Sequence, residues 1–263
     1  MTTAPLEPHQ ARQAAESFGI DAARYDRSRP SYPDAMIESI VADAPGRDVL
    51  DVGIGTGIVA RQLRAAGCTV LGVEADARMA DFARGEGFAV EVAKIEDWQP
   101  RGRTFDVVVS GQAWHWVDPV AGPAKVAQVL RPGGQLAVFW NVMQPPAELE
   151  KAFGDVYRRV LPDSPVTRLT PGSAPAIYAA MADKAADGIR ATGAFGEPEQ
   201  RSYEWDQRYT RDQWLELAGT TGGTTLLAKD VLAELLAGFG AAIDAVGGSF
   251  VCHYTTVVVI ARG

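Results

Sequence analysis

The chain has 263 residues, of which 47% are hydrophobic and 22% charged, as is ordinary for a globular protein. Its formal net charge is −8 and its isoelectric point is about 5.0. Because phosphate backbones are usually bound by a basic protein face, this charge argues against a nucleic-acid partner. The length suits one large α/β domain, or a domain that carries an inserted lid, better than two independent domains.

Three features of the sequence bear on its compartment. The two cysteines, Cys68 and Cys252, lie in apolar stretches and are predicted to be buried, reduced thiols. The first ten residues lack the apolar core of a signal peptide. No apolar run approaches the roughly 20 residues of a membrane span. We therefore expect a cytoplasmic protein with no membrane partner.

Short β-branched runs alternate with helical patterns over the first 140 residues. We predict strands over Asp48–Gly53, Cys68–Glu74, Phe88–Ile95, Phe105–Ser110 and Gln135–Trp140. Helices are predicted over Ile58–Ala66, Ala77–Arg84 and Pro119–Leu130, the last halted by a turn at Arg131–Gly134. Strands joined by crossover helices indicate a parallel sheet that is covered on both faces.

The pattern changes after Asn141. Helices are predicted from Pro145 to about Leu161 and over Ala176–Ala186, separated by a proline-rich break. An edge strand over Gln200–Tyr209, helices near Arg211–Ala218 and Ala228–Val246, and a long strand over Ser249–Ile260 complete the chain. The expected fold is Rossmann-like α/β: a seven-stranded, mostly parallel sheet with an antiparallel last strand, helices on both faces, and a helical lid insertion.

A glycine-rich loop, Asp51–Gly57, lies where the first strand becomes a helix. Glycines there permit positive φ and let backbone N–H groups approach a ligand. Glu74 ends the second strand and is placed to accept hydrogen bonds from ribose hydroxyls. The loop fits a dinucleotide fingerprint as well as an S-adenosylmethionine site. A tight turn without a ligand is the third interpretation.

Three features favour S-adenosylmethionine over a dinucleotide. Asp51 precedes the first glycine, and its carboxylate suits a cationic sulfonium amino acid but would repel a pyrophosphate. The turn at Arg131–Gly134 and the final helix followed by a long strand are typical of methyltransferases. An NAD-dependent oxidoreductase remains the alternative, as does a methyltransferase-fold protein that binds cofactor without catalysis.

Four motifs carry a family resemblance: Tyr25–Pro33, Val49–Gly57, Gly111–Asp118 and Val129–Asn141. On these motifs the chain resembles class I S-adenosylmethionine-dependent methyltransferases, specifically the type 11-like, small-molecule subgroup that includes trans-aconitate methyltransferase-like proteins. The resemblance implies one domain over residues 1–263. Its parts would be a cofactor-covering segment (1–45), a cofactor-binding core (46–141), a lid and acceptor-pocket insertion (142–200) and the completion of the sheet (201–263).

The resemblance also implies roles for individual residues. Gly53 and Gly55 would line the methionine moiety, Glu74 the ribose, and Ala75 the adenine edge. The family usually has alanine where this chain has Ile95, which puts the adenine contact there in question. The full implied cofactor set is Tyr25, Arg29, Asp51, Gly53, Gly55, Glu74, Ala75, Ile95, Glu96, Ser110, Gly111 and Gln112.

The acceptor side is less defined by the sequence. Trp116, Trp140 and Asn141 are predicted to line the acceptor pocket. His115 is the candidate base if the reaction uses one, but the interpretation we favour is that it orients or packs at the pocket floor. A carboxylate nucleophile needs no base. Three lid arginines, Arg158, Arg159 and Arg168, are candidates for binding an acidic acceptor.

We accordingly expect a methyltransferase that uses S-adenosyl-L-methionine to methylate a small molecule, with a carboxylic acid as the candidate acceptor. The three scattered histidines and the absence of paired carboxylates predict no metal site. A monomer and a homodimer are both compatible with the sequence.

Overall fold

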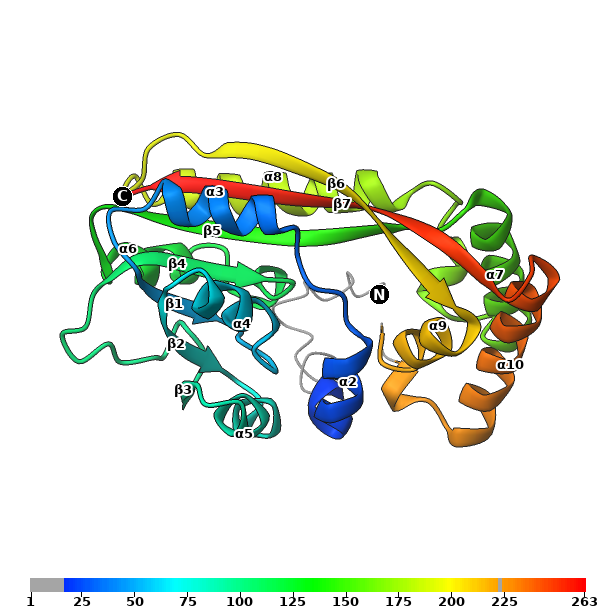
Figure 1. Cartoon of the computed structure of the whole chain (residues 1–263). Helices are drawn as coiled ribbons and strands as arrows, with labels where there is room; N and C mark the ends of the chain where they lie inside the picture. Colours follow the sequence, from blue (N-terminus) through cyan, green and yellow to red (C-terminus); the bar gives the residue numbers. More distant parts are fainter. Residues whose placement is uncertain (1–16, 222–223) are drawn as a thin grey trace, which may run out of the picture.

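The computed structural model describes residues 17–221 and 224–263 (Figure 1). Its centre is a seven-stranded sheet. The strands are β1 (Asp48–Val52), β2 (Thr69–Glu74), β3 (Ala89–Val92), β4 (Phe105–Gly111), β5 (Leu130–Gln144), β6 (Glu199–Thr210) and β7 (Ser249–Arg262). Their order in the sheet is β3-β2-β1-β4-β5-β7-β6.

Strands β1 to β5 pair in parallel, as the alternation with helices predicts. The last strand, β7, lies between β5 and β6 and is antiparallel to both. Figure 1 shows β5, β6 and β7 as long strands that extend beyond the rest of the sheet. The predicted Rossmann-like α/β class, the mostly parallel sheet and its antiparallel last strand are therefore confirmed, whereas the helical lid stays a prediction.

The helices cover both faces of the sheet. Those described are α2 (Ala22–Ser28), α3 (Asp34–Ala42), α4 (Ile58–Ala65), α5 (Ala77–Gly85), α6 (Ala121–Ala127), α7 (Ala147–Val160), α8 (Ala174–Ala191), α9 (Arg211–Ala218) and α10 (Lys229–Ala245). Successive strand residues point to opposite faces. Leu50 accordingly packs in a core with α6 and α8, whereas Val49 packs in a core with α3 and α4.

Several predicted boundaries are wrong. The fifth strand runs over Leu130–Gln144 rather than Gln135–Trp140, and α8 ends at Ala191 rather than Ala186. The helix expected to reach Leu130 ends at Ala127, because Leu130 already pairs with Phe105 of β4. Residues 131–134 then form a bulge inside β5, where Gly133 has a φ of +75°. The third strand ends at Val92 rather than Ile95, since the Lys94 carbonyl begins a turn by accepting the backbone N–H of Trp98.

The segment between β5 and β6 contributes to two cores. Helix α8 packs directly on the sheet through Ala182, Ala185 and Ile189. Helix α7 instead joins α9, α10 and the far halves of the long strands in an aromatic cluster around Phe153 and Trp214. Within the described ranges, no helix combines the length and apolar character that crossing a membrane requires.

Candidate functional site

The loop after β1 has the backbone geometry that its glycines predict. Gly53 and Gly55 have φ values of +71° and +57°. The Gly53 N–H donates to the Val73 carbonyl of β2 at 2.8 Å, which fixes the loop to the neighbouring strand. A Cβ on Gly53 would lie 2.5 Å from the Ala113 Cβ. Only glycine therefore fits at this position.

Asp51 lies beneath this loop and is fully buried. Neither of its carboxylate oxygens has a hydrogen-bond partner in the described structure. Burial, together with the nearby Glu74 carboxylate, raises the pKa of Asp51 to about 8. A buried acid without a partner suits a site that receives a cationic group.

Glu74 ends β2 and faces the same loop. One of its carboxylate oxygens accepts the Gly55 N–H and the other accepts the Asp76 N–H, each at 2.9 Å. Burial raises the pKa of Glu74, and these backbone donors oppose the rise. Glu74 therefore ties the loop to the end of the second strand, in the place expected for a ribose-binding acid.

A cavity of about 140 Å³ opens above these residues at the carboxyl ends of the parallel strands. We call it the first cavity. Its lining is Phe18, Tyr25, Val52, Gly53, Gly55, Val73, Glu74, Ala75, Met79, Ala93, Lys94, Ile95, Glu96, Gly111, Gln112, Ala113, Trp116 and Val117. Nine of the twelve residues proposed to contact the cofactor are in this lining.

The other three proposed contacts lie elsewhere. Asp51 and Ser110 are completely buried, and the Ser110 hydroxyl donates to the Val52 carbonyl at 2.8 Å, so both support the first cavity from below. Arg29 borders a different cavity. Sequence reasoning missed the apolar walls, such as Phe18, Met79 and Val117, because isolated apolar residues carry no motif.

A second cavity, of about 380 Å³, adjoins the first. It is lined by Phe18, Tyr25, Arg29, Pro30, Tyr32, Ile58, Gln112, His115, Trp116, Asn141, Met143, Tyr178, Leu217, Thr221 and Tyr254. Four of these, Phe18, Tyr25, Gln112 and Trp116, also line the first cavity. Gln112 has a positive φ of 54°, which a non-glycine residue rarely adopts. The two cavities thus share a wall that includes one strained residue.

Among the described residues that line the second cavity, Arg29 is the charged one. The others are apolar or uncharged polar residues, including His115, whose pKa is lowered. Its guanidinium carbon lies 4.6 Å from the centre of the Tyr25 ring. One terminal nitrogen donates to the Thr220 carbonyl at 2.5 Å, whereas the buried Nε has no described partner. The guanidinium therefore keeps donor capacity for an anion.

His115 borders the second cavity next to Trp116. Its Nδ1 lies 3.2 Å from the indole nitrogen of Trp140. Burial lowers the pKa of His115 to about 4, so the ring is neutral at physiological pH. Trp140 itself is 1% exposed and does not line the second cavity; it borders a smaller cavity beside α8 and contacts His115.

Asn141, the third residue predicted for the acceptor pocket, does line the second cavity. Its amide nitrogen donates to the Ser31 carbonyl at 3.2 Å, and its amide oxygen accepts the Thr256 hydroxyl at 2.6 Å. Asn141 thereby holds the segment before α3 against the centre of the sheet.

The three lid arginines lie outside both cavities. All three are exposed, and Arg158 pairs with Asp155 of its own helix at 2.5 Å. Sequence composition alone could not separate these solvated arginines from Arg29. In the described part of the chain, no three His, Cys, Asp or Glu side chains are grouped as a metal site requires.

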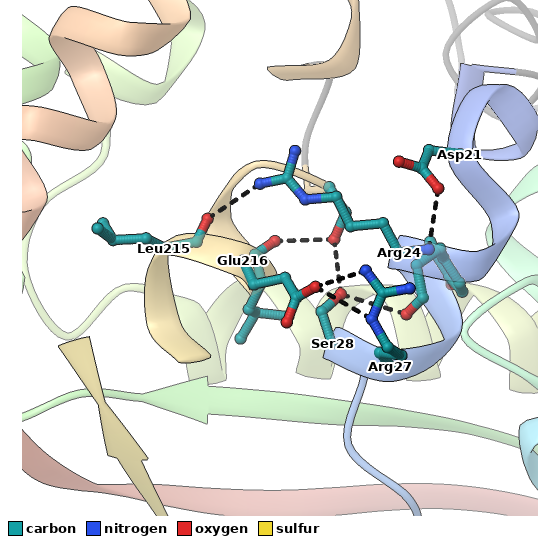
Figure 2. Close-up of polar contacts among 9 residues, drawn as sticks. Asp21, Arg24, Arg27, Ser28, Leu215 and Glu216 are labelled. Atoms are coloured by element: carbon teal, nitrogen blue, oxygen red, sulfur yellow. Dashed lines mark hydrogen bonds and ion pairs between the residues drawn. The ribbon is translucent and has the colours of Figure 1, made fainter. Parts of the chain in front are cut away.

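Helix α2 closes one side of both cavities and is held by α9 (Figure 2). Arg27 pairs with Glu216 at 2.8 Å, and Arg24 donates to the Leu215 carbonyl at 3.5 Å. The Ser28 hydroxyl lies 3.1 Å from that of Thr220. Segments nearly 200 residues apart in sequence therefore meet at the site.

Part of the chain is similar in sequence to known methyltransferases. Residues 50–138 match the methyltransferase domain family. An uncharacterised methyltransferase of Mycobacterium tuberculosis is 35% identical over 156 residues, which is 56% of this chain and 61% of that protein. The match thus spans less than two thirds of the relative's length.

Two solved structures are similar over most of the chain. A proposed type II methyltransferase of Anaeromyxobacter dehalogenans has a TM-score of 0.61 and 26% identity, covering 89% of this chain and 97% of that one. Phosphoethanolamine N-methyltransferase 2 of Haemonchus contortus was solved with phosphomonomethylethanolamine and S-adenosylhomocysteine. Its TM-score is 0.52 and its identity 15%, and the match covers 98% of this chain and 60% of that one. The latter likeness concerns the fold alone. Residues 50–138 of the chain are thus similar to a methyltransferase domain, and its overall fold is similar to that of a proposed methyltransferase.

Proposed function

We propose that the chain binds S-adenosylmethionine in the first cavity and transfers its methyl group to a small carboxylic acid in the second. The observation that carries this proposal is a pair of adjoining cavities, the first above a buried acid without a partner and the second beside a guanidinium. Unpartnered Asp51 underlies the first, and Arg29 borders the second.

The residues around the first cavity fit this cofactor. When bound, the cofactor supplies an electrophilic methyl group on a positively charged sulfur. A cationic ligand beside the buried oxygens of Asp51 would lower the pKa of this carboxyl and favour its ionised form, whereas a dinucleotide pyrophosphate would raise that pKa further. Glu74 presents a carboxylate to ribose hydroxyls, while Ile95 and Val117 offer apolar walls to a nucleobase.

The residues around the second cavity fit an anionic acceptor. The Arg29 guanidinium can bind one carboxylate through two parallel hydrogen bonds. In the proposed step, a carboxylate oxygen forms a bond to the methyl carbon as the carbon–sulfur bond breaks, and the electron pair stays on sulfur. No proton moves, so this chemistry requires no base. The protein's contribution is to hold the oxygen about 3–3.5 Å from the methyl carbon.

The cofactor assignment is tested by calorimetric titration with S-adenosylhomocysteine and, separately, with NAD. We expect binding of the nucleoside and none of the dinucleotide. Tight NAD binding without S-adenosylhomocysteine binding would instead establish the oxidoreductase alternative.

The acceptor class is tested with radiolabelled S-adenosylmethionine and matched panels of carboxylic acids, phenols and amines. Label in base-labile methyl esters is the expected result. Turnover of phenols or amines alone would overturn the carboxylic-acid assignment. Cofactor binding without transfer to any panel, or to a small-molecule extract, would favour the non-catalytic alternative.

A further inference from the structure

His115 contacts Trp140 through a bond that only one arrangement of protons allows. The indole Nε1–H of tryptophan can donate but cannot accept a hydrogen bond. It lies 3.2 Å from His115 Nδ1, so Nδ1 must be the acceptor. A neutral imidazole carries one proton, which must then be on Nε2. Trp140 therefore selects the tautomer of His115.

The indole that makes this selection is held firmly in place. Trp140 is 1% exposed, belongs to the core beneath α8, and pairs with Val257 in the middle of the sheet. The imidazole ring is also flanked by Trp116, whose ring centre lies 4.7 Å away. Neither the donor nor the ring can reorient without disturbing packed aromatic residues.

The other ring nitrogen is available for a ligand. His115 Nε2 makes no hydrogen bond to any described residue, and it is not among the buried polar atoms that lack a partner. The ring borders the second cavity and a smaller one beneath α8. An unpaired N–H donor in a half-buried ring beside a cavity suits an oxygen atom of a bound molecule.

We propose that His115 is a fixed hydrogen-bond donor that binds an acceptor oxygen through Nε2–H, and that Trp140 is the positioning residue that enforces this tautomer. The inference rests on the proposed function for the identity of the acceptor, but not for the state of the ring. His115 then cannot serve as the base, because Nε2 already carries a proton and the Nδ1 lone pair is engaged. Acceptors that are already ionised are favoured over alcohols.

The surroundings of the ring support the neutral form. The titratable side chains lining the two bordering cavities are Arg29, Tyr25, Tyr32, Tyr178 and Tyr254 on one side and Lys184 of α8 on the other. In their described lining there is no carboxylate that would stabilise an imidazolium. Both cations oppose a second proton on the ring.

Nitrogen-15 NMR of the full chain tests the tautomer without any acceptor. There are only three histidines, His9, His115 and His253, so substitution of each assigns the signals. We expect His115 to be neutral and protonated at Nε2 from pH 5.5 to 8.5. Protonation at Nδ1, or titration near pH 6.5, would overturn the proposal.

Trp140→Phe tests the positioning role. Without the indole N–H, we expect the two tautomers of His115 to mix and the ring to titrate closer to its ordinary pKa. Trp98→Phe is the matched control, since Trp98 is equally buried but donates to Glu91. A His115 spectrum unchanged in Trp140→Phe would contradict the proposal, as would an equal change in the control.

The donor role is tested on the protein saturated with S-adenosylhomocysteine, using acetate, benzoate and succinate as probes. We expect at least one probe to shift the Nε2 signal. His115→Gln, which keeps an N–H donor, should retain affinity for that probe within about threefold, and His115→Leu should lose about tenfold. No response to any probe, or equal loss in both variants, would overturn the donor role.

The proposed function fails by a different result. Absence of S-adenosylhomocysteine binding in the wild-type protein would refute the cofactor assignment, while the tautomer measurement would stand unaffected.

Discussion

All but two of the residues that line the first cavity lie between Val52 and Val117, whereas the second cavity draws its lining from Phe18 to Tyr254. The first is built where consecutive parallel strands end, so neighbours in sequence become neighbours in space. The second is closed by α2, α8, α9 and the last strand, which meet only after the whole chain has folded.

The two cavities therefore depend on the sequence in different ways. A site made from adjoining strand ends is carried by short motifs, and its geometry changes little when distant helices change. A site assembled from remote elements depends on how those elements pack, so its chemistry can be altered by substitutions far from any motif. Substitutions around each cavity test whether the two sites differ in this way.

The largest expected effect is that of Gly53→Ala. The new Cβ would lie 2.5 Å from that of Ala113, and alanine at a φ of +71° is strained. We expect S-adenosylhomocysteine affinity to fall about 100-fold or more by calorimetry.

Gly67→Ala is its matched control. Gly67 has a φ of +83° with no atom within 4 Å of an added Cβ. The alanine substitution should lower the free energy of unfolding by about 1–2 kcal/mol and leave the affinity for S-adenosylhomocysteine unchanged. Equal loss of affinity in both variants would show that backbone strain, rather than the fit at the loop, controls binding.

Asp51→Asn comes next on the cofactor side. S-adenosylhomocysteine carries an ammonium group, beside which the Asp51 carboxyl can ionise and asparagine cannot. We therefore expect its affinity to fall about tenfold in calorimetry. Unchanged affinity would mean that Asp51 serves the loop and not the ligand.

The same variant should change how stability depends on pH. The pKa of Asp51 is about 8 when folded and 3.8 when unperturbed. Between these values the folded chain holds more protons at this site, so this group makes stability fall as pH rises from 4 to 8. Asp51→Asn should therefore gain stability relative to wild type across this window, by an amount on the order of 1 kcal/mol or more in urea unfolding. Parallel curves would contradict the raised pKa.

On the acceptor side, Arg29→Gln should raise the KM of a carboxylate acceptor about tenfold while S-adenosylhomocysteine affinity stays within about twofold. Arg168→Gln, at an exposed arginine outside both cavities, is the control and should change neither. If Arg29→Gln instead weakens S-adenosylhomocysteine binding, Arg29 contacts the cofactor, as its place in the implied cofactor set predicts.

The smallest expected effect is at the contact between α2 and α9 (Figure 2). The side chains of Arg27 and Glu216 are 61% and 35% exposed, so solvent screens their attraction. Arg27→Ala should cost less than about 1 kcal/mol in urea unfolding, with little effect on either cavity. A larger cost, coupled to Glu216→Ala in a double-mutant cycle, would mean that this ion pair positions α2.

Much of the fold could be predicted from local pattern. Alternation of strands and helices up to Trp140 predicted the parallel sheet, and the β-branched run after Ser249 predicted the last strand. The errors occurred where pairing overrode local chemistry. Residues 131–134 look like a turn, yet both flanking segments pair with β4, so the turn becomes a bulge within one long strand.

Positive φ values and strand ends are local properties of the chain. The sequence alone therefore predicted where the loop at Asp51–Gly57, the acid at Glu74 and the residues that follow β4 would lie. That Arg29 borders the second cavity, and the lid arginines do not, could be learned only from the tertiary structure. The same is true of Trp140, which contacts His115 and does not line the second cavity. Those outcomes depend on which faces of distant elements pack together, since the free energy of burial is summed over the whole core and is not encoded in any short motif.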